Sequence, residues 1–256
     1  VGWIPESDVD VTDAPAAPPT QKAIFGFGGS NVSLTNLVSS SGVVATDTTG
    51  VGTGRATLAA SGYGTDKAIF GFGETSTEVS MTNLVSNSGV VATDTTGVGT
   101  ARRFLAAAGY GLDKAIFAYG YDGGNVSMSN LVNSSGVVAT DVSGVGTARR
   151  ELGAAGYGST GQAIFAYGYT SGVVSMSNLV NSSGVVSADV SGVGTARRYS
   201  SAAGYGDDKA IFGYGSTGSN VSLTNLVSNT GVVSADVTGV GSAKTYSAGA
   251  GYSLSA

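Results

Sequence analysis

Short apolar runs alternate with turn residues along most of the chain. In one representative stretch, residues 102–148, the runs cover residues 105–110, 114–119, 126–132 and 137–140, and Gly, Asn, Asp and Ser fill the gaps. Runs of this length, separated by turns of this composition, are typical of β-strands. No segment keeps a helical period over ten residues, so the pattern predicts an all-β protein.

The same pattern occurs five times. The tripeptide Ala-Ile-Phe begins at residues 23, 68, 115, 163 and 210. A Gly-Val-Val sequence begins at residues 42, 89, 136, 184 and 231, which gives a repeat of about 47 residues. Four strands in a repeat of this length match one blade of a β-propeller. We therefore predict that residues 21–256 form a five-bladed β-propeller of four-stranded antiparallel blades.

The two ends of this repeat array are offset by one strand. The first copy enters at Gln21 and Lys22, which already belong to a second strand, and residues 244–253 form a first strand with no second one after it. Closing a ring removes exposed sheet edges. We therefore expect the C-terminal strand, residues 244–253, to join the N-terminal blade and complete it.

The amino-acid composition excludes several kinds of catalytic and metal-binding site. Its 256 residues include 42 Gly but no Cys and no His. Disulfides, thiolate nucleophiles, Cys-ligated zinc and Ser-His-Asp triads are therefore excluded. One Asp recurs at the same position of every repeat, at residues 47, 94, 141, 189 and 236. A single recurring acid is unlike the dense oxygen cluster that calcium needs. We predict a protein that is not an enzyme and has no cofactor and no metal site.

Residues 1–20 differ in composition from the repeats. All four Pro residues and the single Trp lie there, and four acidic residues give the segment −4 of the net charge of −5. We interpret it as an acidic arm or linker that docks on a neighbouring subunit. The nearly neutral repeats argue against nucleic-acid binding. Membrane insertion is not expected, because no apolar run approaches the ~20 residues of a span.

The copies differ most from one another in two places. One is the turn after the second strand, and the other follows the repeated basic residue before the inner strand. In a four-stranded antiparallel blade both places lie at the same end, so they should share one face of the disc. Binding residues concentrate on loops that a rigid scaffold holds, although neutral drift of exposed turns explains the variation as well. The candidate ligand-binding residues are Tyr121, Asp122, Asn125, Tyr169, Thr170, Arg103, Arg150, Arg198 and Tyr199.

Two residue types recur at fixed positions in every copy. The basic residue before the inner strand is Arg55, Arg102, Arg149, Arg197 or Lys244. It either pairs with the Asp that each repeat carries or helps to attract an anion at one mouth of the central channel. A Tyr ends each inner strand, at residues 63, 110, 157, 205 and 252. An aromatic residue repeated in this way is expected to contribute to packing.

The repeat resembles a kelch-type repeat over residues 22–252. In both, a basic residue precedes an inner strand of small residues and a hydrophobic strand follows, as at Arg102, residues 106–108 and residues 114–117. The double Gly after the second strand is kept only at Gly28 and Gly29, and the Trp usual late in a kelch blade is absent. The Lys-Ala-Ile-Phe-Gly-Tyr-Gly and Thr-Asn-Leu-Val-Ser segments are similar to repeats of phage tail-fibre-like and microbial surface proteins. This resemblance implies attachment or a scaffold role.

Three functions are compatible with these features. The first is a recognition or attachment module, extracellular or on a virion surface, that binds a glycan or a cell-surface receptor through the variable face. The second is a structural subunit of a virion appendage, an extracellular filament or a surface layer, without a small ligand. The third is a consensus-built repeat protein. Ligand binding by the isolated chain distinguishes the first from the second.

Overall fold

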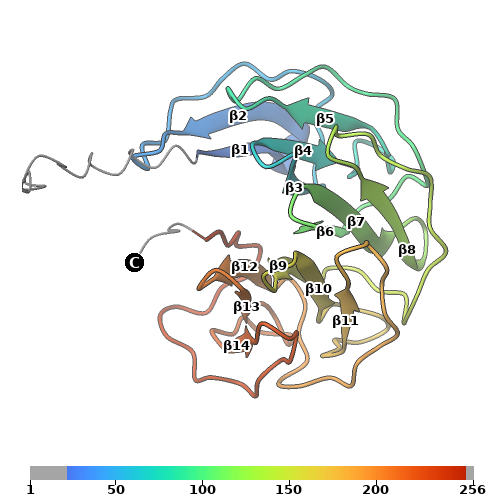
Figure 1. Cartoon of the computed structure of the whole chain (residues 1–256), viewed down its shortest axis with the longest axis vertical. Coiled ribbons are helices and arrows are strands. Elements are labelled where there is room, and N and C mark those ends of the chain that lie inside the picture. Colours follow the sequence, from blue (N-terminus) through green and yellow to red (C-terminus); the bar gives the residue numbers. More distant parts are fainter. Residues whose placement is uncertain (1–21, 252–256) are drawn as a thin grey trace, which may run out of the picture.

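The computed structural model describes residues 22–251, and these residues form an all-β structure. Its strands make five small antiparallel sheets, which follow one another around a common centre (Figure 1). A single short 3-10 turn, η1 (Gly29–Asn31), is the one helical element of the described residues. The all-β class predicted from the strand rhythm is confirmed.

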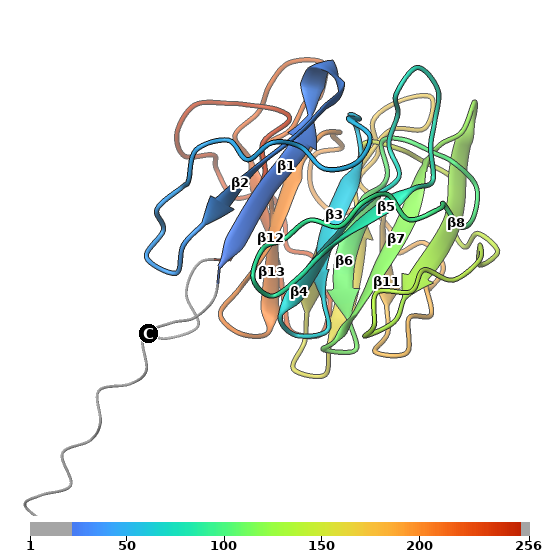
Figure 2. The same ribbon diagram turned by 90° about the horizontal axis from the view of Figure 1, so that it is seen from above.

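One sheet has two strands, and the other four have three. The two-stranded sheet contains β1 (Ala23–Gly28) and β2 (Val32–Val38). In the others an inner strand pairs with a second strand, which pairs with a third. These sheets are β3 (Ala59–Tyr63), β4 (Lys67–Gly71) and β5 (Thr82–Val85); β6 (Ala106–Tyr110), β7 (Lys114–Tyr121) and β8 (Asn125–Val132); β9 (Gly153–Tyr157), β10 (Gln162–Ala166) and β11 (Ser177–Val180); β12 (Ser201–Tyr205), β13 (Lys209–Gly213) and β14 (Thr224–Val227). Seen from above, turns gather at two opposite ends of the strands, so the molecule has two faces (Figure 2).

The prediction of four-stranded blades is wrong. The fourth apolar run of each repeat lies beside the third strand, but it pairs there only through isolated bridges. In one copy these are Val132 with Val138 and Ser129 with Val142. Between the two bridges β8 advances by three residues and the outer run by four, so one extra residue bulges out. The bulge interrupts the pairing, and no continuous fourth strand forms.

A buried asparagine side chain takes the place of the interrupted pairing. Asn130 of β8 is fully buried, and its Nδ2 donates hydrogen bonds to the Ala139 carbonyl at 3.0 Å and to Asp141 Oδ1 at 2.9 Å. Asn36, Asn83, Asn178 and Asn225 make the same two hydrogen bonds in the other copies. The outer run is therefore held to its sheet partly by side-chain hydrogen bonds.

The closed ring expected from the sequence is not present among the described residues. The sheet of β1 and β2 has no inner strand, and residues 244–251 form none. Instead, Gly249 and Gly251 lie close to the carbonyl oxygens of Ala202 and Gly204 in β12. The ring of sheets is thus interrupted between β1 and β12 (Figure 1). The acidic arm, residues 1–20, and the last part of the expected closing strand, residues 252 and 253, lie outside the described residues.

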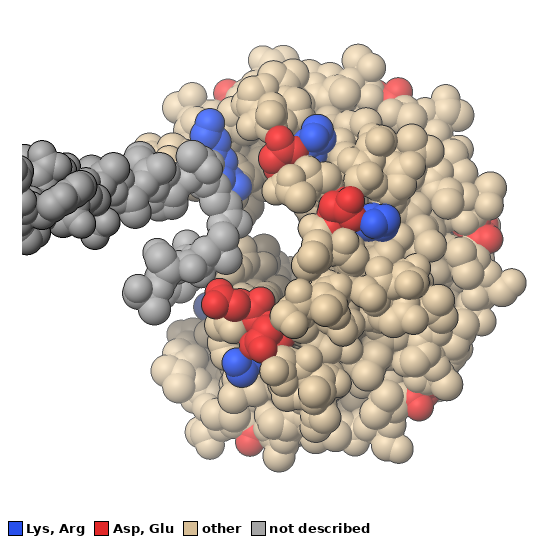
Figure 3. All heavy atoms as spheres, viewed as in Figure 1, with Lys and Arg blue, Asp and Glu red and all other residues tan. Residues whose placement is uncertain are grey.

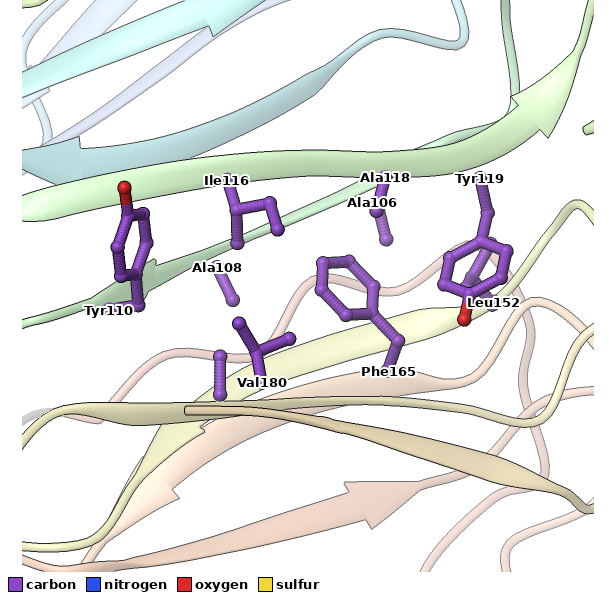
Figure 4. Packing of buried hydrophobic residues seen from close by; sticks show 10 residues of the cluster. Ala106, Ala108, Tyr110, Ile116, Ala118, Tyr119, Leu152, Phe165 and Val180 are labelled. Carbon is purple, nitrogen blue, oxygen red and sulfur yellow. The ribbon is translucent and has the colours of Figure 1, made fainter. Parts of the chain in front are cut away.

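The core lies between neighbouring sheets. Both faces of the second strands β4, β7 and β10 are covered, which explains why Ala-Ile-Phe is apolar there without alternation. From β7, Ile116 and Tyr119 point toward Phe165 of the following sheet (Figure 4), whereas Phe117 packs against the preceding sheet. The Tyr119 and Phe165 ring centres lie 5.7 Å apart. Because both faces are buried, each interior sheet is fixed by its two neighbours.

Candidate functional site

Most of the candidate residues meet at the end of the sheets where the second strands finish. Just before β6 begins, Arg103 forms an isolated bridge with Tyr121, and Arg150 pairs with Tyr169 in the same way one repeat later. These bridges continue the pairing of the inner strand with the second strand on the N-terminal side of each inner strand. The two variable segments are therefore adjacent in each three-stranded sheet, as the order of connections required.

Arginine and tyrosine side chains alternate across this face. The Arg103 and Arg150 guanidinium carbons lie 5.3 and 4.8 Å from the Tyr121 ring centre. Arg150 and Arg198 lie 5.0 and 4.9 Å from the Tyr169 ring centre, and Arg198 lies 5.0 Å from that of Tyr199. Such distances are those of cation–π contacts. We call the set of Arg103, Tyr121, Arg150, Tyr169, Arg198 and Tyr199 the Arg–Tyr ladder.

The remaining three candidates belong to the turns beside the ladder. Asn125 accepts a hydrogen bond from Arg150 Nη1 at 2.9 Å and donates one to the Thr170 carbonyl at 2.9 Å, so it links two neighbouring turns. Asp122 is exposed and accepts a hydrogen bond from the Gly124 N–H within its own turn. Among the described residues it makes no hydrogen bond with the other candidates, so eight of the nine form one connected set.

Three glutamates that sequence reasoning did not select complete this face. Arg103 pairs with Glu74 and, at 3.3 Å, with Glu78. Arg150 and Arg198 both pair with Glu151, each at 3.1 Å. The hydrogen bond to Glu74 raises the pKa of Arg103 above its ordinary value. Three arginines thus face three glutamates, and the ladder is close to neutral.

The sequence positions of the three glutamates are enough to predict their ion pairs. All three occupy the positions where the copies differ: Glu74 and Glu78 in a turn after a second strand, and Glu151 directly after Arg150. Since the opposing arginines occur in neighbouring copies at the same end of the sheet, comparing charges between copies predicts the ion pairs.

The backbone beneath the ladder links the inner strands to one another. Phe104 N–H donates to the Thr57 carbonyl at 3.0 Å, Glu151 N–H to the Phe104 carbonyl at 2.9 Å, and Tyr199 N–H to the Glu151 carbonyl at 2.8 Å. All four residues have φ between 54° and 60°. Side chains other than Gly adopt this left-handed region only at a cost of order 1–3 kcal/mol. The surrounding hydrogen bonds therefore hold this conformation in the residues that directly follow Arg103, Arg150 and Arg198 of the ladder.

Glu151 and Tyr199 form the most enclosed part of the face. The Glu151 side chain is only 3% exposed and accepts hydrogen bonds from Arg150 and Arg198. Burial raises the pKa of the Tyr199 hydroxyl far above its ordinary value, and hydrogen bonding with Tyr246 and Glu151 adds to this effect. The Tyr199 and Tyr246 ring centres are 4.1 Å apart. Tyr199 therefore keeps its proton at neutral pH and acts here as a hydrogen-bonding and packing group.

The repeated arginines before the inner strands do not line the channel mouth. Arg55, Arg102, Arg149 and Arg197 are completely buried. Arg102 Nε donates to the Tyr119 carbonyl at 2.9 Å and Nη1 to the Thr100 carbonyl at 3.1 Å, and its guanidinium carbon lies 4.2 Å from the Phe72 ring centre. Its Nη1 lies 4.0 Å from the Asp141 carboxylate. The expected pairing with Asp is confirmed for these four, and their interpretation as an anion-attracting ring is wrong because no part of them reaches solvent.

The central channel carries a different set of charges. A cavity of about 470 Å³ lies among the inner strands and is lined by Lys67, Lys114 and Lys209. Each lysine pairs with the preceding Asp at 2.7–2.9 Å. In Figure 3 acidic and basic side chains accordingly lie next to one another around the central opening. Since each of these three lysines is paired with a carboxylate, the opening has no excess positive charge that would attract an anion.

Comparison with known proteins assigns the chain to no group. No protein-family model and no curated protein sequence matches it. Within residues 22–251, no cluster of three or more metal-ligating side chains occurs. Over the same residues no helix is long and apolar enough to span a membrane. Any function must therefore be argued from the geometry of the face itself.

Proposed function

We propose that the protein is a non-catalytic recognition or attachment module of an extracellular or virion surface. It binds a glycan or a cell-surface receptor through the Arg–Tyr ladder. The observation that carries this proposal is the combination of a constant scaffold with a variable face. Ala-Ile-Phe recurs in all five copies, whereas the partly exposed Arg and Tyr residues occur in only some of them. Tyr and Arg are also the residues most enriched among the energetic centres of binding interfaces.

The chemistry of the ladder favours an uncharged polar ligand. Its arginines are balanced by Glu74, Glu78 and Glu151, so a polyanion would gain little attraction. Guanidinium groups lie over the rings of Tyr121 and Tyr169, which leaves ring edges, hydroxyls and N–H groups for a ligand. Hydroxyl and carbonyl groups of a neutral sugar, or of a protein backbone, match these donors and acceptors.

The scaffold that we propose for this module is a kelch-like, closed five-bladed propeller. Five consecutive sheets around one centre support it, as does the offset of one strand between the two ends of the repeat array. Residues 244–253 would then provide the missing inner strand of the sheet of β1 and β2. A closed ring would hold the turns of all five copies in fixed relative positions, which a multi-point binding face requires.

Binding to a glycan array tests the recognition proposal. We expect saturable binding of the folded chain to a neutral glycan. A variant with both Tyr121→Ala and Tyr169→Ala is expected to bind at least about tenfold more weakly, because two central aromatic contacts are removed. The matched control carries Val137→Ala and Val185→Ala, two exposed residues of the same repeats at the outer edge of the sheets. Equal binding by the two variants, or a blank array with folded protein, would contradict glycan recognition by the ladder.

A second candidate function, a structural subunit, is favoured by a different surface. The first valine of each Gly-Val-Val sequence lies on the outermost run of its repeat and is 62–65% exposed in every copy. We call this set the valine belt: Val43, Val90, Val137, Val185 and Val232. Exposed apolar residues that recur at one structural position favour side-by-side packing with neighbouring subunits. The acidic arm, residues 1–20, would be the second docking element of such a subunit.

Polar substitution of the valine belt tests the structural candidate. Replacing all five belt valines with Thr is expected to abolish concentration-dependent assembly in sedimentation velocity, because Thr keeps the shape but weakens apolar burial. The double Tyr variant of the ladder is expected to assemble like the parent chain. A parent chain that stays monomeric at every accessible concentration, or that assembles equally well without its belt valines, would count against this function.

A further inference from the structure

Two polar contacts recur wherever one repeat meets the next. The Thr100 hydroxyl donates to Asp141 Oδ2 at 2.7 Å, and Arg102 donates to the carbonyl oxygens of Tyr119 and Phe117 in the following sheet. The Thr–Asp contact occurs in the same form at Thr53 and Asp94, Thr147 and Asp189, and Thr195 and Asp236. Four junctions between consecutive repeats therefore share one polar arrangement.

Apolar contacts recur at the same junctions. The aromatic residue near the end of one second strand packs against the Phe of the next, as Phe72 does against Phe117 with ring centres 5.2 Å apart. The Gly that begins the outer run lies against the preceding sheet: a Cβ on Gly136 would lie 2.9 Å from side-chain atoms of Leu84 and Tyr63. These contacts and the polar ones together describe the interface that one repeat offers to its successor.

The first and last sheets carry the same contact groups, but across the interruption these groups do not contact each other. Phe25 is 55% exposed, whereas the equivalent Phe117 is completely buried. A Cβ on Gly42 or on Gly241 would meet no atom within 4 Å, although the equivalent glycines of the other copies are in close contact. Leu226 is 39% exposed on the opposite side of the interruption. The sheet of β1 and β2 and the sheet of β12–β14 thus expose the two halves of one interface.

We propose that these two halves close onto each other within one chain. Ser242 then donates to Asp47, Lys244 donates to the carbonyl oxygens of Phe25 and Phe27, and the Phe25 ring packs against Tyr214. These pairs occupy the repeat positions that are in contact at the other four junctions. One contact differs at the fourth junction, where Arg197 donates to Asn225 Oδ1 instead of to the carbonyl of Phe212. This proposal rests on the closed propeller proposed above and specifies which side chains contact each other when the ring closes. It does not depend on any ligand.

The position of residues 244–251 indicates that the chain itself, not a second copy, fills the interruption between β1 and β12. Residues 248–251 already lie along β12, beside which the next inner strand belongs, and Lys244 lies over the Tyr214 ring, 4.4 Å from its centre. The pairing of β3 with β4 places Ala60 opposite Phe70, which in the fifth junction corresponds to Gly249 opposite Phe25. Because both halves belong to one chain, their effective concentration exceeds that of a second copy in dilute solution.

Amide hydrogen exchange of β1 tests the closure. In the full chain, amides of residues 23–28 are expected to exchange at least about tenfold more slowly than in a chain that ends at residue 243, because pairing with an inner strand protects them. Amides of β7 serve as an internal reference and should exchange equally in both chains. A full-length Asp47→Ala variant should also exchange faster in β1, and it keeps the test valid if the truncated chain fails to fold.

The exchange rates distinguish closure within one chain from an open ring and from a dimer, and they do not depend on ligand binding. Slow exchange of β1 in a monomer, at low and at high protein concentration, supports the proposal. Rates in β1 that are the same in the parent and in Asp47→Ala would overturn it. Protection that appears only at high concentration together with dimers would also overturn it, because a second copy would then be the occupant. All measurements use ligand-free protein with an intact ladder, so they are independent of the glycan result.

Discussion

Replacing Arg102 with Met is expected to destabilise the folded state by about 3–5 kcal/mol, because it removes the donor that serves several buried acceptors at once. The Arg102 guanidinium donates to the carbonyls of Tyr119, Thr100 and Phe117. Met fills much of the same volume but donates no hydrogen bond, so these carbonyls stay buried without a partner. Burial lowers the pKa of Arg102 to about 10, so the guanidinium remains charged at neutral pH. The loss would appear as a lower urea midpoint of unfolding.

The adjacent residue provides a matched control for this experiment. Arg103 has the same side chain, but it is 32% exposed and pairs with Glu74 and Glu78. Exposed ion pairs contribute about 0–1 kcal/mol, so Arg103→Met should shift the midpoint only slightly. Arg102→Lys is expected to fall between the two, since an ammonium cannot reproduce the planar arrangement of donors. Equal shifts for Arg102→Met and Arg103→Met would contradict the role assigned to the buried arginine.

Stability is expected to be level from neutral pH down to about pH 5 and to fall steeply below about pH 4. We attribute this dependence chiefly to four repeated carboxylates, those of Asp94, Asp141, Asp189 and Asp236. Burial by itself raises their pKa values, but hydrogen bonds from a Thr hydroxyl, an Asn amide and a backbone N–H, together with a nearby Arg, lower them below the ordinary value of 3.8. Hydrogen bonds from Lys67 and Lys209 lower the pKa values of Asp66 and Asp208 as well. The unfolded chain therefore binds protons more readily than the folded one. Stability is lost as the pH drops from the unfolded pKa through the lower folded one.

Urea midpoints at a series of pH values test this prediction. Asp141→Asn should lower stability at neutral pH, because its amide cannot accept all of the hydrogen bonds made to a carboxylate. It should also fall less steeply with acid than the parent chain, since one of the four titrating groups is gone. The Asp122→Asn variant is the control, because Asp122 is exposed and hydrogen bonds only within its own turn. Parallel curves for the parent and Asp141→Asn would show that this carboxylate does not cause the acid sensitivity.

Periodic features of the fold were predictable without coordinates. The spacing of the apolar runs predicted β-strands, and the uninterrupted Ala-Ile-Phe segments of β4, β7 and β10 are buried on both faces. The pairing of the repeated Arg with the repeated Asp was one of two open interpretations, and it is the one observed for the four buried arginines. The adjacency of the two variable segments followed from the order of strands in an antiparallel sheet.

Other features could not be read from a single repeat. The bulge that interrupts the fourth strand lies where the Asn130 amide, in competition with backbone donors, donates to the Ala139 carbonyl. A pattern of apolar and polar residues contains no information on that competition. Likewise, Glu151 joins the ladder because it meets Arg198, 47 residues later in the sequence, across two sheets. The near-neutral charge of the candidate face is a consequence of such ion pairs between residues of different repeats.

The sequence by itself determined the strand rhythm, the five copies and the common end of the variable segments, because these depend on local periodicity and on the order of connections. Only the tertiary structure decided that the repeated arginines are buried and that the candidate residues are joined by glutamates. It also left Phe25 of the first sheet and Leu226 of the last sheet exposed. The physical reason is that burial, ion pairing and closure depend on which groups of different repeats come together, as Thr100 and Asp141 do across 41 residues of sequence.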